Sequence, residues 1–124
     1  MHYVALDAKQ ARLNVCDLET IGRVTGRAHV VEIWFAADPT RDRVYMMAGD
    51  RDAADWVRNV RHDGRIRIKL GRTWLSGYAT VIEGSPDEAP CRHLLAAKYY
   101  GWTEGRPLGE WARDSLPVAI DLET

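Results

Sequence analysis

Residues 20–37 read TIGRVTGRAHVVEIWFAA, and this stretch decides the kind of fold that the sequence predicts. Two glycines bracket its first part, 22–27, which is typical of a turn. Its second part, 28–37, is rich in β-branched and aromatic residues and therefore predicts a strand. The residues before the turn, 13–21, predict a further, irregular strand. This stretch alone indicates a strand-rich chain.

The chain beyond residue 37 continues in strands and turns. A loop over 38–42 leads to a strand that we expect to form a hairpin with 28–37. Ile66, Ile68 and Leu70 alternate with basic residues, which predicts a half-buried strand. A proline opens the last strand, which favours an edge or strand-entry position. The six predicted strands cover residues 13–21, 28–37, 43–48, 65–70, 73–83 and 117–122.

A first helix is predicted after the third strand. Asp50 or Asp52 can cap it, and Ala53, Trp56, Val57 and Val60 then follow helical spacing on one face. We expect it to end near Gly64, which can take a left-handed conformation.

Helices also fill the segment before the last strand. The run 85–88, Ser-Pro-Asp-Glu, is typical of a helix start, and that helix ends at Gly101 or Gly105. A short helix is predicted over 107–114. Mostly antiparallel strands of these lengths close into a barrel or pack as a sandwich, and we predict a small barrel whose openings the helices cover.

The composition predicts one globular domain over residues 1–124. Hydrophobic residues make up 46% of the chain and charged residues 28%, and 17 basic residues nearly balance 18 acidic ones, which argues against a nucleic-acid partner. No apolar run approaches the roughly 20 residues of a membrane span. Met1–Asp7 lacks the pattern of a secretory signal, so we expect a cytoplasmic protein with no integral membrane segment.

Signatures of nucleophilic and metal sites are missing. The sequence has no GxSxG, HExxH or P-loop motif, and its four histidines have no partner at metal-binding spacing, so no metal is expected. Cys16 and Cys91 form no CxxC motif and are expected to be free thiols. Cys91 falls on the apolar face of a predicted helix, where a small buried side chain is typical.

The turn at 22–27 is the first candidate binding site. Arg23, Arg27 and His29 surround two glycines and Thr25. Glycines let backbone N–H groups approach an anion closely, and the guanidinium fork matches phosphate oxygens. The alternative is an ordinary hairpin turn with solvated arginines.

Two further segments could line a site. The segment 48–52 joins a strand to a helix start, where N–H groups can hold a phosphate or a ring carbonyl, although Asp50 and Asp52 can also act as ordinary caps. The aromatic segment 99–102, with Trp111 nearby, could form one wall of a flat pocket or belong to the core.

These segments together resemble the deazaflavin (F-420)-dependent nitroreductase and quinone reductase family. Residues 20–26 resemble its T-x-G-R-x-S/T-G motif, and 31–35 match the strand that follows. Residues 56–60 resemble its W-x-x-N-L/V helix, and 117–120 its final strand. The order and spacing of these motifs carry the resemblance over about residues 15–122.

The resemblance implies a mainly β fold with helices, a six-stranded antiparallel split β-barrel related to flavin reductases and pyridoxamine 5′-phosphate oxidase. The implied cofactor is coenzyme F-420, an 8-hydroxy-5-deazaflavin with a phosphate and an acidic tail. Arg23 and Arg27 match positions that hold the phosphate or tail, and Trp56 and Asn59 match the helix that borders the groove. The implied cofactor-binding residues are Arg23, Thr25, Gly26, Arg27, Gly49, Arg51, Trp56 and Asn59.

The implied reaction transfers a hydride from reduced F-420 to a small-molecule acceptor such as a quinone, a nitroaromatic or an enone. Trp102 belongs to the implied substrate wall, and Tyr99 or Tyr100 is expected to donate a hydrogen bond or proton to the developing anion. Many members carry lysines where this chain has Val24 and the segment 50–52. Flavin mononucleotide (FMN) therefore stays open as an alternative cofactor, and non-catalytic binding as an alternative function. A homodimer stays open as the assembly.

Overall fold

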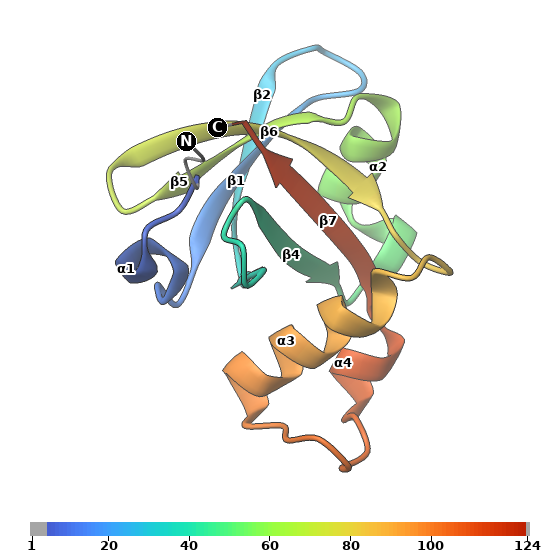
Figure 1. Cartoon of the computed structure of the whole chain (residues 1–124). Helices are drawn as coiled ribbons and strands as arrows, with labels where there is room; N and C mark the ends of the chain where they lie inside the picture. The colour runs from blue at the N-terminus through green and yellow to red at the C-terminus, as the bar shows by residue number, and fades with distance from the viewer. Residues whose placement is uncertain (1–4, 124) are drawn as a thin grey trace.

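One curled antiparallel sheet of seven strands organises the computed structural model, which describes residues 5–123 (Figure 1). The strand order is β2-β1-β5-β6-β7-β4-β3. The strands are β1 (Cys16–Ile21), β2 (Ala28–Ile33), β3 (Ala36–Ala37), β4 (Arg43–Ala48), β5 (Arg65–Leu70), β6 (Thr73–Val81) and β7 (Leu116–Leu122). The helices are α1 (Ala8–Ala11), the 3₁₀ turn η1 (Arg51–Ala53), α2 (Asp55–His62), α3 (Glu88–Tyr100) and α4 (Glu110–Asp114). The predicted mainly β fold with helices is confirmed.

The inner face of the curled sheet forms the main core. In β5, the predicted alternation is confirmed, since Ile66, Ile68 and Leu70 are buried. Phe35 and Met46 are fully buried in the same cluster. Burying a side chain of this size contributes about 1.5–3 kcal/mol, so the alternating pattern itself stabilises the curled sheet.

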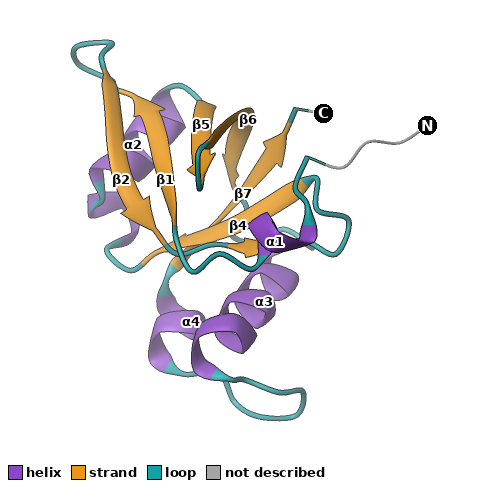
Figure 2. Cartoon of the chain, turned by 90° about the vertical axis from the view of Figure 1, so that its left-hand side faces the viewer, coloured by secondary structure: helices purple, strands orange, loops and turns teal. Residues whose placement is uncertain are grey.

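Helices cover the sheet at two places. α3 and α4 lie together at one end of the molecule, where Leu95 and Ala96 pack against Tyr45 and Met47 on the outer side of β4 (Figure 2). α2 contributes Val57 to a smaller buried cluster. Because β4 therefore has buried residues on both faces, it carries the continuous apolar run 44–48.

The predicted strand 28–37 is divided in two, which explains the seventh strand. β2 pairs with β1, and only the two residues of β3 pair with β4, so the predicted hairpin between 28–37 and 43–48 is wrong for its larger part. The break falls at Trp34 and Phe35. The Phe35 N–H donates to the Tyr99 hydroxyl, and the Phe35 carbonyl accepts from Lys98, so this backbone leaves the sheet for α3.

The predicted boundaries hold in part. α2 ends at His62, close to the predicted end, but Gly64 has no left-handed conformation; a Cβ there would lie 2.5 Å from the Tyr78 ring, so close packing is what requires glycine. α3 begins at Glu88, later than expected, and ends at Gly101 in a left-handed conformation, as predicted. Pro117 lies near the start of β7, but β7 is an inner strand between β6 and β4.

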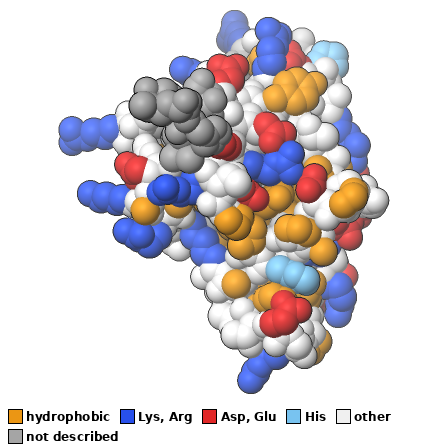
Figure 3. Space-filling view, viewed as in Figure 1, with side chains coloured by type: hydrophobic (Ala, Val, Ile, Leu, Met, Phe, Trp, Pro, Cys, Tyr) orange, Lys and Arg blue, Asp and Glu red, His pale blue; other side chains and the backbone are white. Residues whose placement is uncertain are grey.

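The surface carries both signs of charge. On the face shown in Figure 3, basic and acidic side chains lie intermixed, in keeping with the formal net charge of −1. Over residues 5–123, every helix is too short or too polar to cross a membrane. His2 and most of the segment Met1–Asp7 lie outside the described residues.

Candidate functional site

The inner face of β2 is uncovered, and this creates the candidate site. His29, Val31 and Ile33 stand opposite buried residues of β1, so their side chains point to the same inner side. His29 and Val31 are nevertheless exposed and Ile33 is half-buried. A pocket lies at each end of this face: His29 lines one and Ile33 lines the other. The two residues are about 13 Å apart along the strand.

The turn pocket lies at the end of the β1–β2 hairpin that points away from α3 and α4 (Figure 2). It has a volume of about 200 Å³. The Gly26 N–H donates to the Gly22 carbonyl, and the Thr25 hydroxyl accepts from the Arg27 N–H, which closes the turn. The lining residues are Gly22, Arg23, Val24, Thr25, His29, Asp55 and Asn59.

Asn59 fixes Arg23 in the turn pocket. Its side-chain oxygen accepts from the Arg23 backbone N–H at 3.2 Å and from the guanidinium at 2.8 Å. Its amide nitrogen donates to the Thr20 hydroxyl at 3.0 Å, and Asn59 is only 1% exposed. Asn59 therefore links α2 to the hairpin and positions Arg23, instead of presenting its own amide to a ligand.

The charges of the turn pocket are only partly paired. Arg23 also forms an ion pair with Asp55 at 3.2 Å, but the Asp55 side chain is 81% exposed, where such a pair is weak. Arg27 lies on the same turn but outside the pocket lining; it is exposed and has no ion pair within residues 5–123. The His29 ring lies so close to Gly22 that a Cβ there would sit 2.7 Å from it. The backbone N–H groups of Gly22, Arg23, Gly26 and Arg27 already donate within the turn or to Asn59, so the guanidinium groups are what the turn offers to an anion.

The aromatic pocket lies at the other end of β2, next to α3 and α4. It has a volume of about 370 Å³ and is lined by Val15, Glu32, Ile33, Trp34, Met47, Tyr100 and Trp111. The Trp34 ring stacks on Tyr99 at 4.3 Å and meets Trp111 edge-on at 5.3 Å. Flat rings in this arrangement suit the face or edge of a ring ligand.

The two candidate catalytic tyrosines have different surroundings. The Tyr99 hydroxyl accepts from the Phe35 N–H and lies 2.8 Å from the carbonyls of Asn14 and Phe35, and burial raises its pKa to about 12. Tyr100 is 63% exposed and lines the aromatic pocket. This geometry favours Tyr100 as the group that meets a substrate.

Three other predicted cofactor contacts lie apart from the turn pocket. Gly49 lies beside Trp111: a Cβ added at Gly49 would be 3.8 Å from the Trp111 ring. The Arg51 guanidinium pairs with Glu83 and donates to the Asp114 carbonyl at 2.7 Å, so it is bound to the fold. Trp56 is half-buried and packs against the core.

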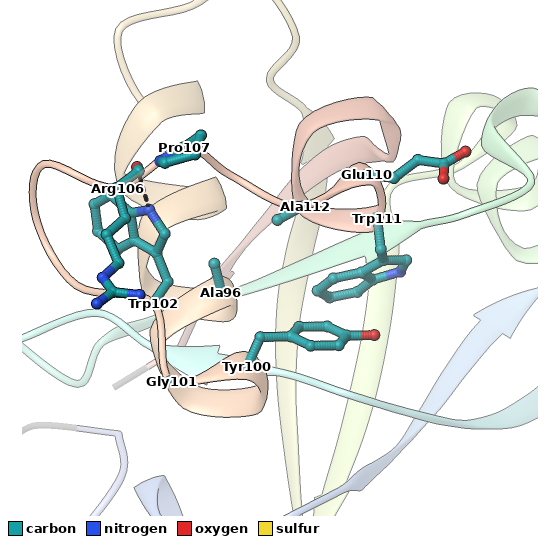
Figure 4. Close-up of a pocket in the computed structure, with 10 residues that line it drawn as sticks. Ala96, Tyr100, Gly101, Trp102, Arg106, Pro107, Glu110, Trp111 and Ala112 are labelled. Carbon is teal, nitrogen blue, oxygen red and sulfur yellow. Dashed lines mark hydrogen bonds between the residues drawn. The ribbon is translucent and has the colours of Figure 1, made fainter.

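A third cavity, the helical cavity, lies between α3 and α4 and has a volume of about 430 Å³ (Figure 4). Trp102 lines it and not the aromatic pocket. Its indole N–H donates to the Arg106 carbonyl at 2.8 Å, and its ring stacks on His93 at 4.4 Å. Tyr100 and Trp111 line both this cavity and the aromatic pocket.

Met47, Ile33 and Glu32 line the aromatic pocket, although the sequence predicted no site role for them. The signal for Ile33 was available in principle, because it shares a strand face with His29. Met47 carried no such signal, since it falls in an apolar run. Among residues 5–123, no group of three His, Cys, Asp or Glu side chains could hold a metal ion. Burial raises the pKa of both Cys16 and Cys91 to about 12, which leaves neither thiol reactive.

Comparisons with known proteins agree on a family and a fold. A family model described as F420H(2)-dependent quinone reductase matches residues 6–122. No curated protein matches the sequence. Among solved structures, an F420 reductase is 16% identical with a TM-score of 0.65, and the match covers 99% of this chain and 97% of that one.

Two other solved structures share the fold. A proposed pyridoxamine 5′-phosphate oxidase from Listeria innocua is 14% identical, with a TM-score of 0.67 and coverage of 94% of this chain and 90% of that one. A proposed 5-nitroimidazole antibiotic resistance protein from Bacteroides thetaiotaomicron is 13% identical, with a TM-score of 0.69 and coverage of 98% and 83%. At sequence identities this low, the similarity to these structures shows only that the split-barrel fold is shared.

Proposed function

The chain belongs to the F420H(2)-dependent quinone reductase family, and from this premise we propose that the inner face of β2 binds reduced F-420 and that the aromatic pocket receives a quinone. One observation carries the proposal. The uncovered face of β2 has guanidinium donors at one end and aromatic rings at the other. The basic end suits the phosphate and acidic tail of the cofactor, and the aromatic end suits its flat ring together with the quinone, which must lie against that ring to accept a hydride.

The residues present fit this cofactor. Arg23 and Arg27 offer guanidinium donors to the phosphate or tail, and Asn59 holds Arg23 in place. Val31 and Ile33 give the strand an apolar surface between the two ends. Val24, 88% exposed, supplies no charge, so Arg23 and Arg27 carry most of the attraction.

The protein side chains act by binding and orienting. When bound, the reduced deazaflavin supplies a hydride, which is the chemistry that none of the side chains can provide. Trp34 and Trp111 contact each other edge-on, so together they would form one wall against a bound flat ring and exclude water from that side. The Tyr100 hydroxyl can donate a hydrogen bond or proton to a quinone oxygen as negative charge develops there.

Side-by-side titrations with F-420 and with FMN test the proposal, with ligand fluorescence as the signal. We expect F-420 to bind more tightly. Arg23→Met should weaken F-420 binding at least about tenfold, because charge-assisted hydrogen bonds contribute about 1.5–3 kcal/mol.

Arg61→Met is the matched control, because Arg61 also lies on the exposed surface but pairs with Asp52 and lines neither pocket. Its affinity for F-420 should stay at the wild-type value. Tighter binding of FMN, or binding of neither ligand, contradicts the proposal. Equal losses in both arginine variants would show that the turn pocket is not the anion site.

Two finer expectations belong to the same proposal. One is that the protein acts in the cytoplasm. The other is a homodimer: β2 is an edge strand, and Val30 on it is 52% exposed, a surface that a second copy could cover. Light scattering of the purified protein measures the assembly directly.

A further inference from the structure

We propose that the helical cavity binds an apolar side chain of the quinone, so that the acceptor extends from the aromatic pocket into the space between α3 and α4. The inference rests on the proposed function, because it assigns a second subsite to the same acceptor. It makes the length of the quinone side chain a determinant of specificity.

The two spaces are neighbours with a common wall. Tyr100 and Trp111 line both the aromatic pocket and the helical cavity, and their ring centroids are 5.8 Å apart. Figure 4 shows the Tyr100 ring beneath Trp111 at the edge of the cavity. A molecule whose ring occupies the aromatic pocket therefore has the cavity as the nearest enclosed space for a substituent.

The chemistry of the cavity wall fits a hydrocarbon chain. Beside the two shared rings it consists of Ala96, Ala112, Trp102 and Pro107, with glycines between them. The charged residues of the lining, Arg106 and Glu110, are both exposed, and the Glu110 carboxylate points away from Trp102 (Figure 4). A chain entering the cavity would exchange water for apolar contacts, and each buried methylene group would strengthen binding.

One hydrogen bond and one ring stack brace the wall of the cavity. The Trp102 indole N–H donates to the Arg106 carbonyl across the loop (Figure 4). The Trp102 ring stacks on His93 of α3. Trp102 therefore braces the loop that follows α3 and does not collapse into the space. Preformed apolar cavities of roughly 300–1,000 Å³ are typical of small-molecule sites, and a volume of about 430 Å³ falls in that range.

Gly109 offers a clean way to fill the cavity. It lines the cavity, its φ of −69° is accessible to any residue, and a Cβ added there meets nothing within 4 Å. Gly109→Leu should therefore be accommodated with little strain, and it adds a bulky side chain to the wall of the cavity. Gly109→Ser is the matched control, because serine is small and suits the N-cap position that Gly109 holds before α4.

The test compares two quinones with the same ring, menadione and its geranyl-substituted analogue, using reduced F-420 as the donor. We expect wild-type protein to have the higher kcat/KM for the geranyl compound. Gly109→Leu should lower that value at least about tenfold, which corresponds to two or three methylene groups losing their contacts. The value for menadione should stay within about twofold, and Gly109→Ser should behave as wild type with both.

A binding measurement without turnover gives an independent readout. Tryptophan fluorescence of the cofactor-free protein is titrated with the geranyl compound and with menadione, and Gly109→Leu should weaken only the first. Equal kcat/KM values for both quinones in wild-type protein, or equal losses with both in Gly109→Leu, overturn the inference and leave the quinone reductase function intact. If the protein catalyses no oxidation of reduced F-420 by either quinone, the proposed function fails. The fluorescence titration then still decides whether the cavity binds the geranyl side chain.

The fold of the variants is checked by thermal unfolding. Leucine is a poorer N-cap residue than glycine, and a folded domain tolerates this loss. Should Gly109→Leu unfold, Gly109→Met replaces it as the bulky variant, and a loss confined to the geranyl compound is again the expected result.

Discussion

At the scale of single residues, Tyr99 and Tyr100 are adjacent on one helix but differ in their contacts and in their proposed roles. Both follow Lys98 at the end of α3, yet the Tyr99 hydroxyl is bonded to the backbone of Phe35 while Tyr100 is 63% exposed. The Tyr99 ring serves as the platform on which Trp34 stacks. Sequence alone suggested either tyrosine, because helical spacing does not say which one finds a backbone partner.

Replacing each tyrosine by phenylalanine separates the two roles. Tyr100→Phe should lower kcat for quinone reduction at least about tenfold, because it removes a donor to the developing anion, and should leave the Kd for F-420 within about twofold. Tyr99→Phe should instead lower the free energy of unfolding by about 1–3 kcal/mol, because the Phe35 N–H loses its acceptor.

Steady-state kinetics and urea denaturation of both variants give the comparison. A large loss of kcat in Tyr99→Phe together with a normal rate in Tyr100→Phe would contradict this assignment. It would return the donor role to Tyr99 despite its bonds to Phe35.

The candidate site could be predicted from the sequence only in part, and Asn59 and Arg51 show why. Both were expected to contact the cofactor. Asn59 lines the turn pocket, but its amide bonds Thr20, which is 39 positions earlier, and Arg51 pairs with Glu83, which is 32 positions later. Local motifs predicted which segments meet, whereas the partner of a given polar atom depends on contacts between segments far apart in the chain.

At the scale of elements, strand periodicity predicted most of the sheet. The alternation of apolar and basic residues suffices to predict β5, because one side of that strand faces the core and the other faces solvent. It fails at Trp34 and Phe35, where the residues still look like a strand but the backbone bonds to α3. The start of β3 therefore could not be predicted, because its cause lies 63 to 64 residues later in the chain.

The pairing of β6 with β7 depends on a glycine within the strand. A Cβ on Gly77 would lie 2.6 Å from the Asp121 carbonyl oxygen, a backbone atom that cannot move without parting the two strands. Gly77→Ala should therefore lower the free energy of unfolding by about 1–3 kcal/mol, the usual cost of overpacking. Urea denaturation measures this loss.

Gly49→Ala provides the comparison, because its nearest atom outside the chain neighbours is 3.8 Å away, on the Trp111 ring. This substitution should cause no loss of stability. If Gly77→Ala were equally harmless, the approach of β6 to β7 would have enough slack to take a methyl group, and the tight contact would not constrain the sheet.

At the scale of the whole molecule, α3 fastens the helical layer to the ends of the first two strands. The Lys98 ammonium donates to the carbonyls of Leu13 and Phe35 at 2.7 and 2.8 Å, and the Tyr99 hydroxyl lies 2.8 Å from the Asn14 carbonyl. These contacts hold the segment before β1 and the end of β2 against one helix. The aromatic pocket lies beside this junction, so its shape depends on the junction staying intact.

The protonation of Lys98 makes the strength of this junction depend on pH. Burial lowers the pKa of its ammonium from 10.5 to about 8, while the charge on a Cys16 thiolate would raise it. Two carbonyl oxygens and the Phe35 ring, 3.8 Å away, also favour the charged form. Between about pH 8 and 10.5 the unfolded chain binds more protons than the folded one, so the contribution of Lys98 to the free energy of unfolding rises with pH in that window.

Urea denaturation of wild-type protein and Lys98→Met at about pH 7 and about pH 9.5 tests this dependence. The stability difference, wild type minus variant, should be larger at the higher pH. Cys16 and Tyr99, whose pKa values burial raises to about 12, are present in both proteins and largely cancel from the difference. Lys9→Met, on the exposed helix α1, is measured in parallel as the control. A difference that stays level or falls with pH would show that the two carbonyls keep Lys98 protonated in the folded protein, so that the junction remains a charged one throughout.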